Sequence, residues 1–264
     1  MAARYIERVV PTLLLFLAFS NTFARAGGDA TREIIGFSPD GRYFAFEQYG
    51  VQDGSGYPYS EIFVIDAAED KWVAETPIRK RIDDEKVKPR KVREAARAEA
   101  EPILTKLNIS EPGEHLFSRP RAEFGLPNLA TVNIAHRSVP PAEQLVTFSL
   151  AEKPLTSAEC AKYSDRPMQG FSLHMRLGPP ILDPKEQQFR WDHLILHDDE
   201  TLPESRGCAL GYQIADVLSF EAGSKVTYVV LLHVQTVGFE GPDSRFLAVT
   251  RICRRADCEL RKSL

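Results

Sequence analysis

Residues 221–234, with the sequence EAGSKVTYVVLLHV, place a turn directly before an extended apolar segment. Residues 221–224 are the small and polar residues of a tight turn. From Val226 to Val234 nearly every residue is apolar, so both faces of a strand built from them would be apolar. Such a strand is stable where other layers cover each face. This stretch therefore predicts a central strand and a β-rich protein.

The segments on either side of this strand alternate apolar and polar residues. Residues 171–177 (FSLHMRL) alternate throughout, and so do Leu210, Tyr212 and Ile214 with their neighbours. Alternation predicts strands with one buried and one solvated face. Residues 238–243 have the composition of a turn, which completes a three-stranded meander. We expect a mainly β fold whose antiparallel sheets pack as a sandwich or as a partial propeller.

The first part of the chain after residue 26 predicts four more strands. They lie at residues 33–37, 43–46, 61–66 and 71–73, and Ser-Pro-Asp-Gly at residues 38–41 is typical of a type I turn. The succession Phe-Ser-Pro-Asp-Gly-Arg, Phe-Ala-Phe and Ile-Phe-Val-Ile-Asp resembles one blade of a TolB-like β-propeller over residues 32–75. This resemblance implies propeller geometry, and a propeller usually has about 4–8 such blades.

A segment of different composition, residues 78–112, predicts a helical insertion. Val92, Ala96 and Ile103 fall on one helical face, which predicts a helix over about residues 91–107. Pro102 would kink or divide that helix. The many basic residues here could bind an anionic surface, but the neighbouring acidic residues offset most of their charge. We therefore interpret the segment as a solvated helix face.

Residues 1–26 have the three parts of a secretory signal peptide. Arg4 and Arg8 precede an apolar run at residues 13–19, and Ala24-Arg25-Ala26 forms a small-residue cleavage site. The run is about half as long as the roughly 20 residues that span a bilayer. We therefore predict cleavage before Gly27 and export.

The mature chain, residues 27–264, predicts a single secreted β-rich domain. Its parts are blade-like hairpins at 27–77, the helical insertion at 78–112 and an antiparallel β region at 113–264. It has 30 basic and 36 acidic residues, a formal charge of −6. Nucleic-acid binding requires a clustered excess of lysine and arginine, so we expect no nucleic-acid partner. No further apolar run predicts a transmembrane segment.

All four cysteines, Cys160, Cys208, Cys253 and Cys258, lie in the mature chain. An even number of cysteines in an exported protein favours disulfides. Four residues separate Cys253 from Cys258, a spacing that suits a hairpin, and this leaves Cys160 to pair with Cys208. A zinc site is the alternative, but the Cys-x-x-Cys spacing typical of one is absent. We predict the disulfides Cys160–Cys208 and Cys253–Cys258.

No residues have the spacing of a catalytic or metal centre. Ser55 lies in Asp-Gly-Ser-Gly, which lacks the Gly-x-Ser-x-Gly pattern of serine hydrolases. Cys208 could be a nucleophile, but export favours its disulfide form. His193 and His197 are four residues apart on a predicted strand, where the strand rise separates them by roughly 13 Å. One metal could not bind both without a bend, so we predict no catalytic residue, metal or cofactor.

A Gly-rich loop is predicted at residues 50–59, and its part from Asp53 to Tyr59 is the best candidate for a binding surface. It contains Asp53, Tyr57 and Tyr59. Aspartate accepts hydrogen bonds, and tyrosine rings stack on a sugar or a partner's backbone. The alternative is a simple connection whose tyrosines fold onto the sheet. The expected partner is an envelope protein or a glycan.

Four segments together resemble an uncharacterised family of predicted secreted bacterial proteins. They are residues 37–49, residues 51–59, the Ala-rich charged helix and residues 237–243 (VGFEGPD). This resemblance spans essentially the whole mature chain and implies a periplasmic location, but no activity, substrate or cofactor. The blade-like hairpins and the lack of a catalytic set of residues favour a non-catalytic binding or interaction module. The alternative is an envelope-acting hydrolase whose site is assembled from residues distant in sequence.

Overall fold

The computed structural model describes residues 27–127, 129–139, 142–180 and 192–254. The described residues are mainly β, as predicted. They contain one α-helix, α1 (Pro89–Lys106), and the short 3-10 helices η1 (Arg121–Glu123), η2 (Cys160–Lys162) and η3 (Glu204–Arg206). The strands are β1 (Thr31–Phe37), β2 (Tyr43–Val51), β3 (Pro58–Asp66), β4 (Lys71–Trp72), β5 (Ile78–Arg81), β6 (Glu114–Ser118), β7 (Thr131–Val139), β8 (Ala142–Leu155), β9 (Met168–Pro180), β10 (Asp192–Asp198), β11 (Ala209–Ala222), β12 (Lys225–Thr236) and β13 (Asp243–Arg254).

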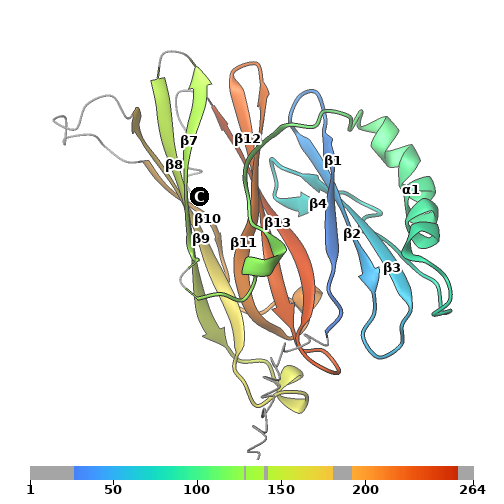
Figure 1. Cartoon of the computed structure of the whole chain (residues 1–264). Coiled ribbons are helices and arrows are strands. Elements are labelled where there is room, and N and C mark those ends of the chain that lie inside the picture. The colour runs from blue at the N-terminus through green and yellow to red at the C-terminus, as the bar shows by residue number, and fades with distance from the viewer. Residues whose placement is uncertain (1–26, 128, 140–141, 181–191, 255–264) are drawn as a thin grey trace, which may run out of the picture.

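These strands form three antiparallel sheets that stack as layers (Figure 1). The N-terminal sheet contains β1 to β5, and the outer sheet contains β7 to β10. The central sheet, in the order β13-β12-β11-β6, stands between them. Helix α1 covers the other face of the N-terminal sheet (Figure 1). The predicted packing of antiparallel sheets is confirmed.

The central strand predicted from residues 226–234 is β12, and every one of these residues is buried. Val230 and Leu232 belong to the apolar cluster shared with the outer sheet. Val229 and Leu231 belong to the cluster shared with the N-terminal sheet. Strand β12 pairs with β11 on one side and β13 on the other, which confirms the predicted meander.

The N-terminal sheet contains β1 to β4 in sequence order, as one propeller blade would. Two strands are longer than predicted: β2 continues beyond residue 46 to Val51, and β3 begins at Pro58 rather than at residue 61. The predicted ten-residue loop at 50–59 is therefore only residues 52–57. Residues 78–81, predicted as part of the helical insertion, instead form β5 and pair with β3.

Helix α1 confirms the predicted helix but is not divided at Pro102. Its buried residues Val92, Ala96 and Ala100 face the N-terminal sheet, where Ala96 and Ala100 pack against Ile62. Ile103, which follows Pro102, packs against the same cluster. Apolar contacts on both sides of the proline thus keep the helix continuous, although proline contributes no amide donor.

A buried carboxylate fixes α1 on the sheet. Glu47 of β2 is fully buried, and its oxygens accept hydrogen bonds from Arg93 Nε at 2.8 Å, Arg97 Nη2 at 2.7 Å and Ser60 Oγ at 2.8 Å. Burial opposes the charged form, but the hydrogen bonds from Arg93 and Arg97 outweigh it and lower the pKa of Glu47. Glu33 contacts both arginines as well. The helix is therefore held by charge as well as by apolar packing.

The disulfide Cys160–Cys208 is present, with Cα atoms 5.4 Å apart and 48 residues between the partners in sequence. It joins η2 to the residue directly before β11. Cys258 lies outside the described residues, so the pair Cys253–Cys258 stays a prediction. Residues 1–26 also lie outside them, and the signal peptide with its cleavage before Gly27 stays a prediction. Among the described helices, none has the length and apolarity to cross a membrane.

We expect Glu47→Gln to lower the free energy of unfolding by about 2–3 kcal/mol at pH 7. This is less than the roughly 3–5 kcal/mol for a fully buried pair, because the Arg97 side chain is 42% exposed. The full loss of stability should be seen above pH 4.3, about the pKa of glutamate in the unfolded chain. It should disappear as the pH falls through the lower pKa of Glu47 in the folded protein. Urea denaturation at several pH values measures it.

The control is Glu94→Gln, which removes the exposed partner of Arg90 on the same helix. It should leave the stability nearly unchanged at every pH. Equal loss in the two variants, or a deficit in Glu47→Gln that persists at low pH, would contradict the assigned role of Glu47.

Replacing Cys160 and Cys208 together by serine should lower the free energy of unfolding by about 4 kcal/mol. The chain-entropy model gives this value for a closed loop of the 48-residue separation observed here. Denaturation of oxidised protein, compared with the double variant, measures the difference. An unchanged midpoint would mean that the disulfide does not constrain the unfolded chain.

Candidate functional site

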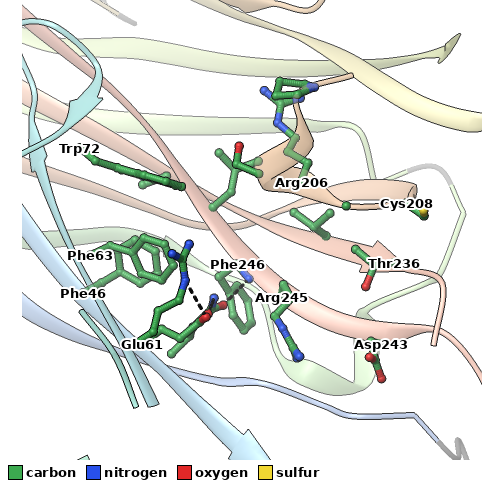
Figure 2. A pocket seen from close by; sticks show the side chains of 18 of the residues that line it. Phe46, Glu61, Phe63, Trp72, Arg206, Cys208, Thr236, Asp243, Arg245 and Phe246 are labelled. Carbon is green, nitrogen blue, oxygen red and sulfur yellow. Dashed lines mark hydrogen bonds and ion pairs between the residues drawn. The ribbon is translucent and has the colours of Figure 1, made fainter. Parts of the chain in front are cut away.

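A cleft of about 970 Å³ opens where the central sheet ends at its edge strand, β13 (Figure 2). Five consecutive residues of β13, Arg245 to Val249, form its floor. The N-terminal sheet forms one wall with Phe46, Phe63 and Trp72. The opposite wall comes from the outer sheet's side of the stack and includes Tyr163, His197, Pro203, Ser205, Arg206, Gly207 and Cys208.

Three exposed aromatic rings surround this cleft. Trp72 is 45% exposed, Tyr163 65% and Phe239 82%. They come from β4, from the residue after η2 and from the β12–β13 connection, respectively. Among the residues whose exposure the structure describes, six large apolar side chains are exposed, and half of them line this cleft. Exposed apolar surface concentrated in one place is typical of a binding surface.

The aromatic wall continues inward from Trp72. The Phe63 ring lies 5.8 Å from Trp72 and 4.9 Å from Phe46, and the two phenylalanine rings are nearly parallel. Arg79 lies over the Trp72 ring with its Cζ 5.7 Å from the centroid, and its Nε donates to Glu61 at 3.1 Å. The wall thus has a flat apolar surface, and beside it the charge of Arg79 is balanced by Glu61.

Arg245 places a positive charge at one end of the floor. Its Nη1 donates to the Tyr59 hydroxyl at 2.8 Å, and its Cζ lies 4.6 Å from the Tyr59 ring centroid. Burial raises the pKa of Tyr59 to about 12, so the phenol stays protonated at neutral pH. Within the described ranges, Arg245 forms no ion pair with a carboxylate. Its charge is therefore available to a ligand.

The carboxylates of the cleft accept hydrogen bonds from the fold itself. Asp53 accepts from the Glu240 amide at 2.8 Å, and Asp243 accepts from the Gly28 amide at 2.7 Å. Asp70 accepts from the amide and the hydroxyl of Thr250, at 2.8 and 2.9 Å. Burial raises the pKa of Asp70, and the two hydrogen bonds from Thr250 only partly oppose this.

A polar network stiffens the wall that carries Arg206. The guanidinium contacts Asp199 and lies over the Phe171 ring, with Cζ 4.6 Å from the centroid. His197 Nε2 lies 2.8 Å from both Asp199 Oδ1 and Arg206 Nη2. Burial opposes the charged form of Asp199, but the hydrogen bonds of Arg206 and His197 lower its pKa. The disulfide at Cys208 holds the same wall.

The structure separates the three predicted binding residues. Asp53 lines the cleft, where its loop meets the β12–β13 connection. Tyr59 was expected in an exposed loop but lies in β3, only 5% exposed, where it supports Arg245. Tyr57 remains in the loop, half-buried, with Arg81 Cζ 6.0 Å from its ring. It is not among the residues that line the cleft.

The other candidates for chemistry have structural partners. Ser55 Oγ lies 3.4 Å from Gln52 Oε1 and 3.3 Å from the Tyr57 amide nitrogen. His193 approaches His174 rather than His197, with His174 Nδ1 3.1 Å from His193 Nε2. In the described part of the chain, no group of three or more potential metal ligands is found.

Sequence reasoning missed Trp72, Tyr163 and Arg245. Each is an ordinary strand or loop residue in its local context. They meet because β4, η2 and β13 come together from three parts of the chain, and no local periodicity encodes such a meeting. The concentration of exposed aromatic rings was therefore visible only in the folded chain.

Comparison with known proteins agrees with the predicted family resemblance. Residues 45–251 match the model of a family described as "Predicted secreted protein (DUF2259)". No curated protein and no solved structure shows significant similarity to the chain. Because the match covers most of the β strands and α1, this chain belongs to the DUF2259 family of predicted secreted proteins.

Proposed function

We propose that the protein is exported to the periplasm and acts there as a non-catalytic binding module whose ligand occupies the cleft at β13. The observation that carries this proposal is the gathering of Trp72, Tyr163 and Phe239 around one cleft. A ligand that covers exposed aromatic rings removes apolar surface from water, and this stabilises the complex. A ligand of either expected class, an envelope protein or a glycan, offers flat apolar surface for such contacts.

The volume and the polar groups also suit a ligand site. A cleft of about 970 Å³ lies at the upper end of the usual range for such sites. The wall with Phe46, Phe63 and Trp72 is aromatic, while Arg245, Thr236 and Asp243 add a few polar groups near one end (Figure 2). This combination of apolar surface and a few orienting polar groups is common in binding sites.

The second candidate function is hydrolysis of envelope material, and Asp70 is the observation that favours it. Its raised pKa and its place in the cleft are properties of a general acid. A hydrolase also needs a nucleophile or a base beside the acid. Asp243, Asp53 and Asp70 instead accept hydrogen bonds from Gly28, Glu240 and Thr250, respectively. Glu61, the fourth described carboxylate of the cleft, pairs with Arg79, and these structural partners favour binding over catalysis.

Trp72 allows a direct test, because the chain has only two tryptophans. In a Trp191→Phe background, its fluorescence should shift when peptide or glycan fractions of the envelope are added. Trp72→Ala should reduce capture of the active fraction at least tenfold, since the ring supplies the stacking surface. It should change the free energy of unfolding by about 1 kcal/mol or less, because the side chain is half-exposed.

Ile195→Ala is the matched control, because Ile195 is 58% exposed on β10 and does not line the cleft. It should capture the fraction as the native chain does. Equal capture by Trp72→Ala would contradict the cleft as the binding site. Turnover of an envelope substrate that Asp70→Asn abolishes would instead establish the hydrolase.

A further inference from the structure

The floor of the cleft is the edge of a sheet. Strand β13 pairs with β12 on one side and is the last strand of the central sheet in the described chain. An edge strand presents unpaired amide and carbonyl groups to whatever lies beside it. Arg245 to Val249, the residues of this edge, line the cleft.

The even-numbered residues of β13 direct their amides toward this open side. The Ser244 amide donates to Gly28 O at 2.9 Å, the Phe246 amide to Gln48 Oε1 at 2.7 Å and the Thr250 amide to Asp70 Oδ1 at 2.8 Å. In an antiparallel pair, alternate residues direct both backbone groups outward. Ala248 lies between Phe246 and Thr250 in this alternation. Its N–H therefore faces the cleft, and no acceptor for it occurs among the described residues.

The chain already pairs an extended segment with Ser244, near the start of β13. Asp29 forms a parallel β-bridge with Ser244, and the Ala30 amide donates to Ser244 O at 3.3 Å. Farther along β13, the Phe246 amide donates to the Gln48 side chain and the Thr250 amide to the Asp70 side chain. These two contacts prevent another chain from pairing along the whole strand. Between these two side chains only a short segment centred on Ala248 can add to the edge.

The two walls of the cleft would lie above and below a strand added to β13, as the neighbouring sheets lie above and below the central sheet. The central sheet lies between the N-terminal and outer sheets, and a strand added to β13 would continue that middle layer, about 4.8 Å from β13. Its alternate side chains would face Phe63 and Trp72 on one side, and Tyr163 and Arg206 on the other. A strand with apolar side chains fits this arrangement.

Resting on the proposed function, we propose that the ligand is an extended polypeptide segment that adds to β13 at Ala248. Its backbone exchanges hydrogen bonds with the N–H and C=O of Ala248, its apolar side chains contact the aromatic wall, and a carboxylate of the segment pairs with Arg245. Strand addition of this kind takes affinity from the main chain and specificity from side-chain pockets. A glycan would use the aromatic rings but not the strand edge.

The test uses the full chain and a synthetic library of hexapeptides in which apolar residues alternate with threonine and glutamate ends the peptide. Ala248→Pro removes the outward N–H, and proline is tolerated on an edge strand where the amide faces away from its neighbour. Ala248→Ser keeps the N–H and is the control. Peptides retained by the native chain should bind Ala248→Ser within twofold and Ala248→Pro at least tenfold more weakly.

Methylation of the peptide backbone tests the same contact without altering the protein. N-methylation at the amide that faces β13 should abolish binding, and N-methylation at the next amide should preserve it. Arg245→Gln should weaken binding of the glutamate peptide about tenfold and leave its glutamine counterpart unaffected.

Retention that survives methylation at every amide, or equal retention by Ala248→Pro, would overturn strand addition. If no hexapeptide is retained but chitohexaose shifts Trp72 fluorescence, the peptide inference fails and the cleft remains a binding site. If neither probe affects Trp72, the proposed function fails as well. Dimerisation that Ala248→Pro abolishes would assign the edge to a second copy of the chain and refute a peptide partner.

Discussion

The requirement to bury both faces of β12 organises this protein. Residues 226–234 are all buried, with Val230 and Leu232 facing one neighbouring sheet and Val229 and Leu231 the other. Burying one such side chain contributes about 1.5–3 kcal/mol relative to leaving it exposed. A single covering sheet would leave half of this gain unrealised. Three layers of strands follow from that constraint.

The need to cover apolar faces also applies to the N-terminal and outer sheets, and the stack ends where the outward face of an element is polar. Strand β3 is also buried on both faces, with Phe63 toward the central sheet and Ile62 toward α1. The helix can end the stack because its other face is solvated, and Glu47 binds it through Arg93 and Arg97. On the opposite side, β9 alternates buried Leu173 and Met175 with less buried neighbours, so the outer sheet needs no further cover.

The cleft results from unequal layers. The central sheet ends at β13, whereas Trp72 on one side and Tyr163 on the other extend beside its edge. Gln48 and Asp70 satisfy the outward amides of Phe246 and Thr250 on either side of Ala248, which protects the edge from long pairing with another chain. The remaining open position, the aromatic rings and Arg245 make the cleft a place for a short ligand. The side chains of Gln48 and Asp70 thus both protect the edge from long pairing and limit the ligand to a short segment.

Periodicity in the sequence determined the helix and several of the strands, including the central position of residues 226–234, because local burial patterns encode them, but it did not reveal β5. The even number of cysteines and the hairpin spacing of Cys253 and Cys258 also led to the pair Cys160–Cys208, which the structure contains. The tertiary structure alone decided the layer order, the burial of Tyr59 and the meeting of Trp72, Tyr163 and Arg245. Strand periodicity states which face of a strand is buried, but not which distant segment covers it. A site built between layers therefore depends on contacts that no local pattern records.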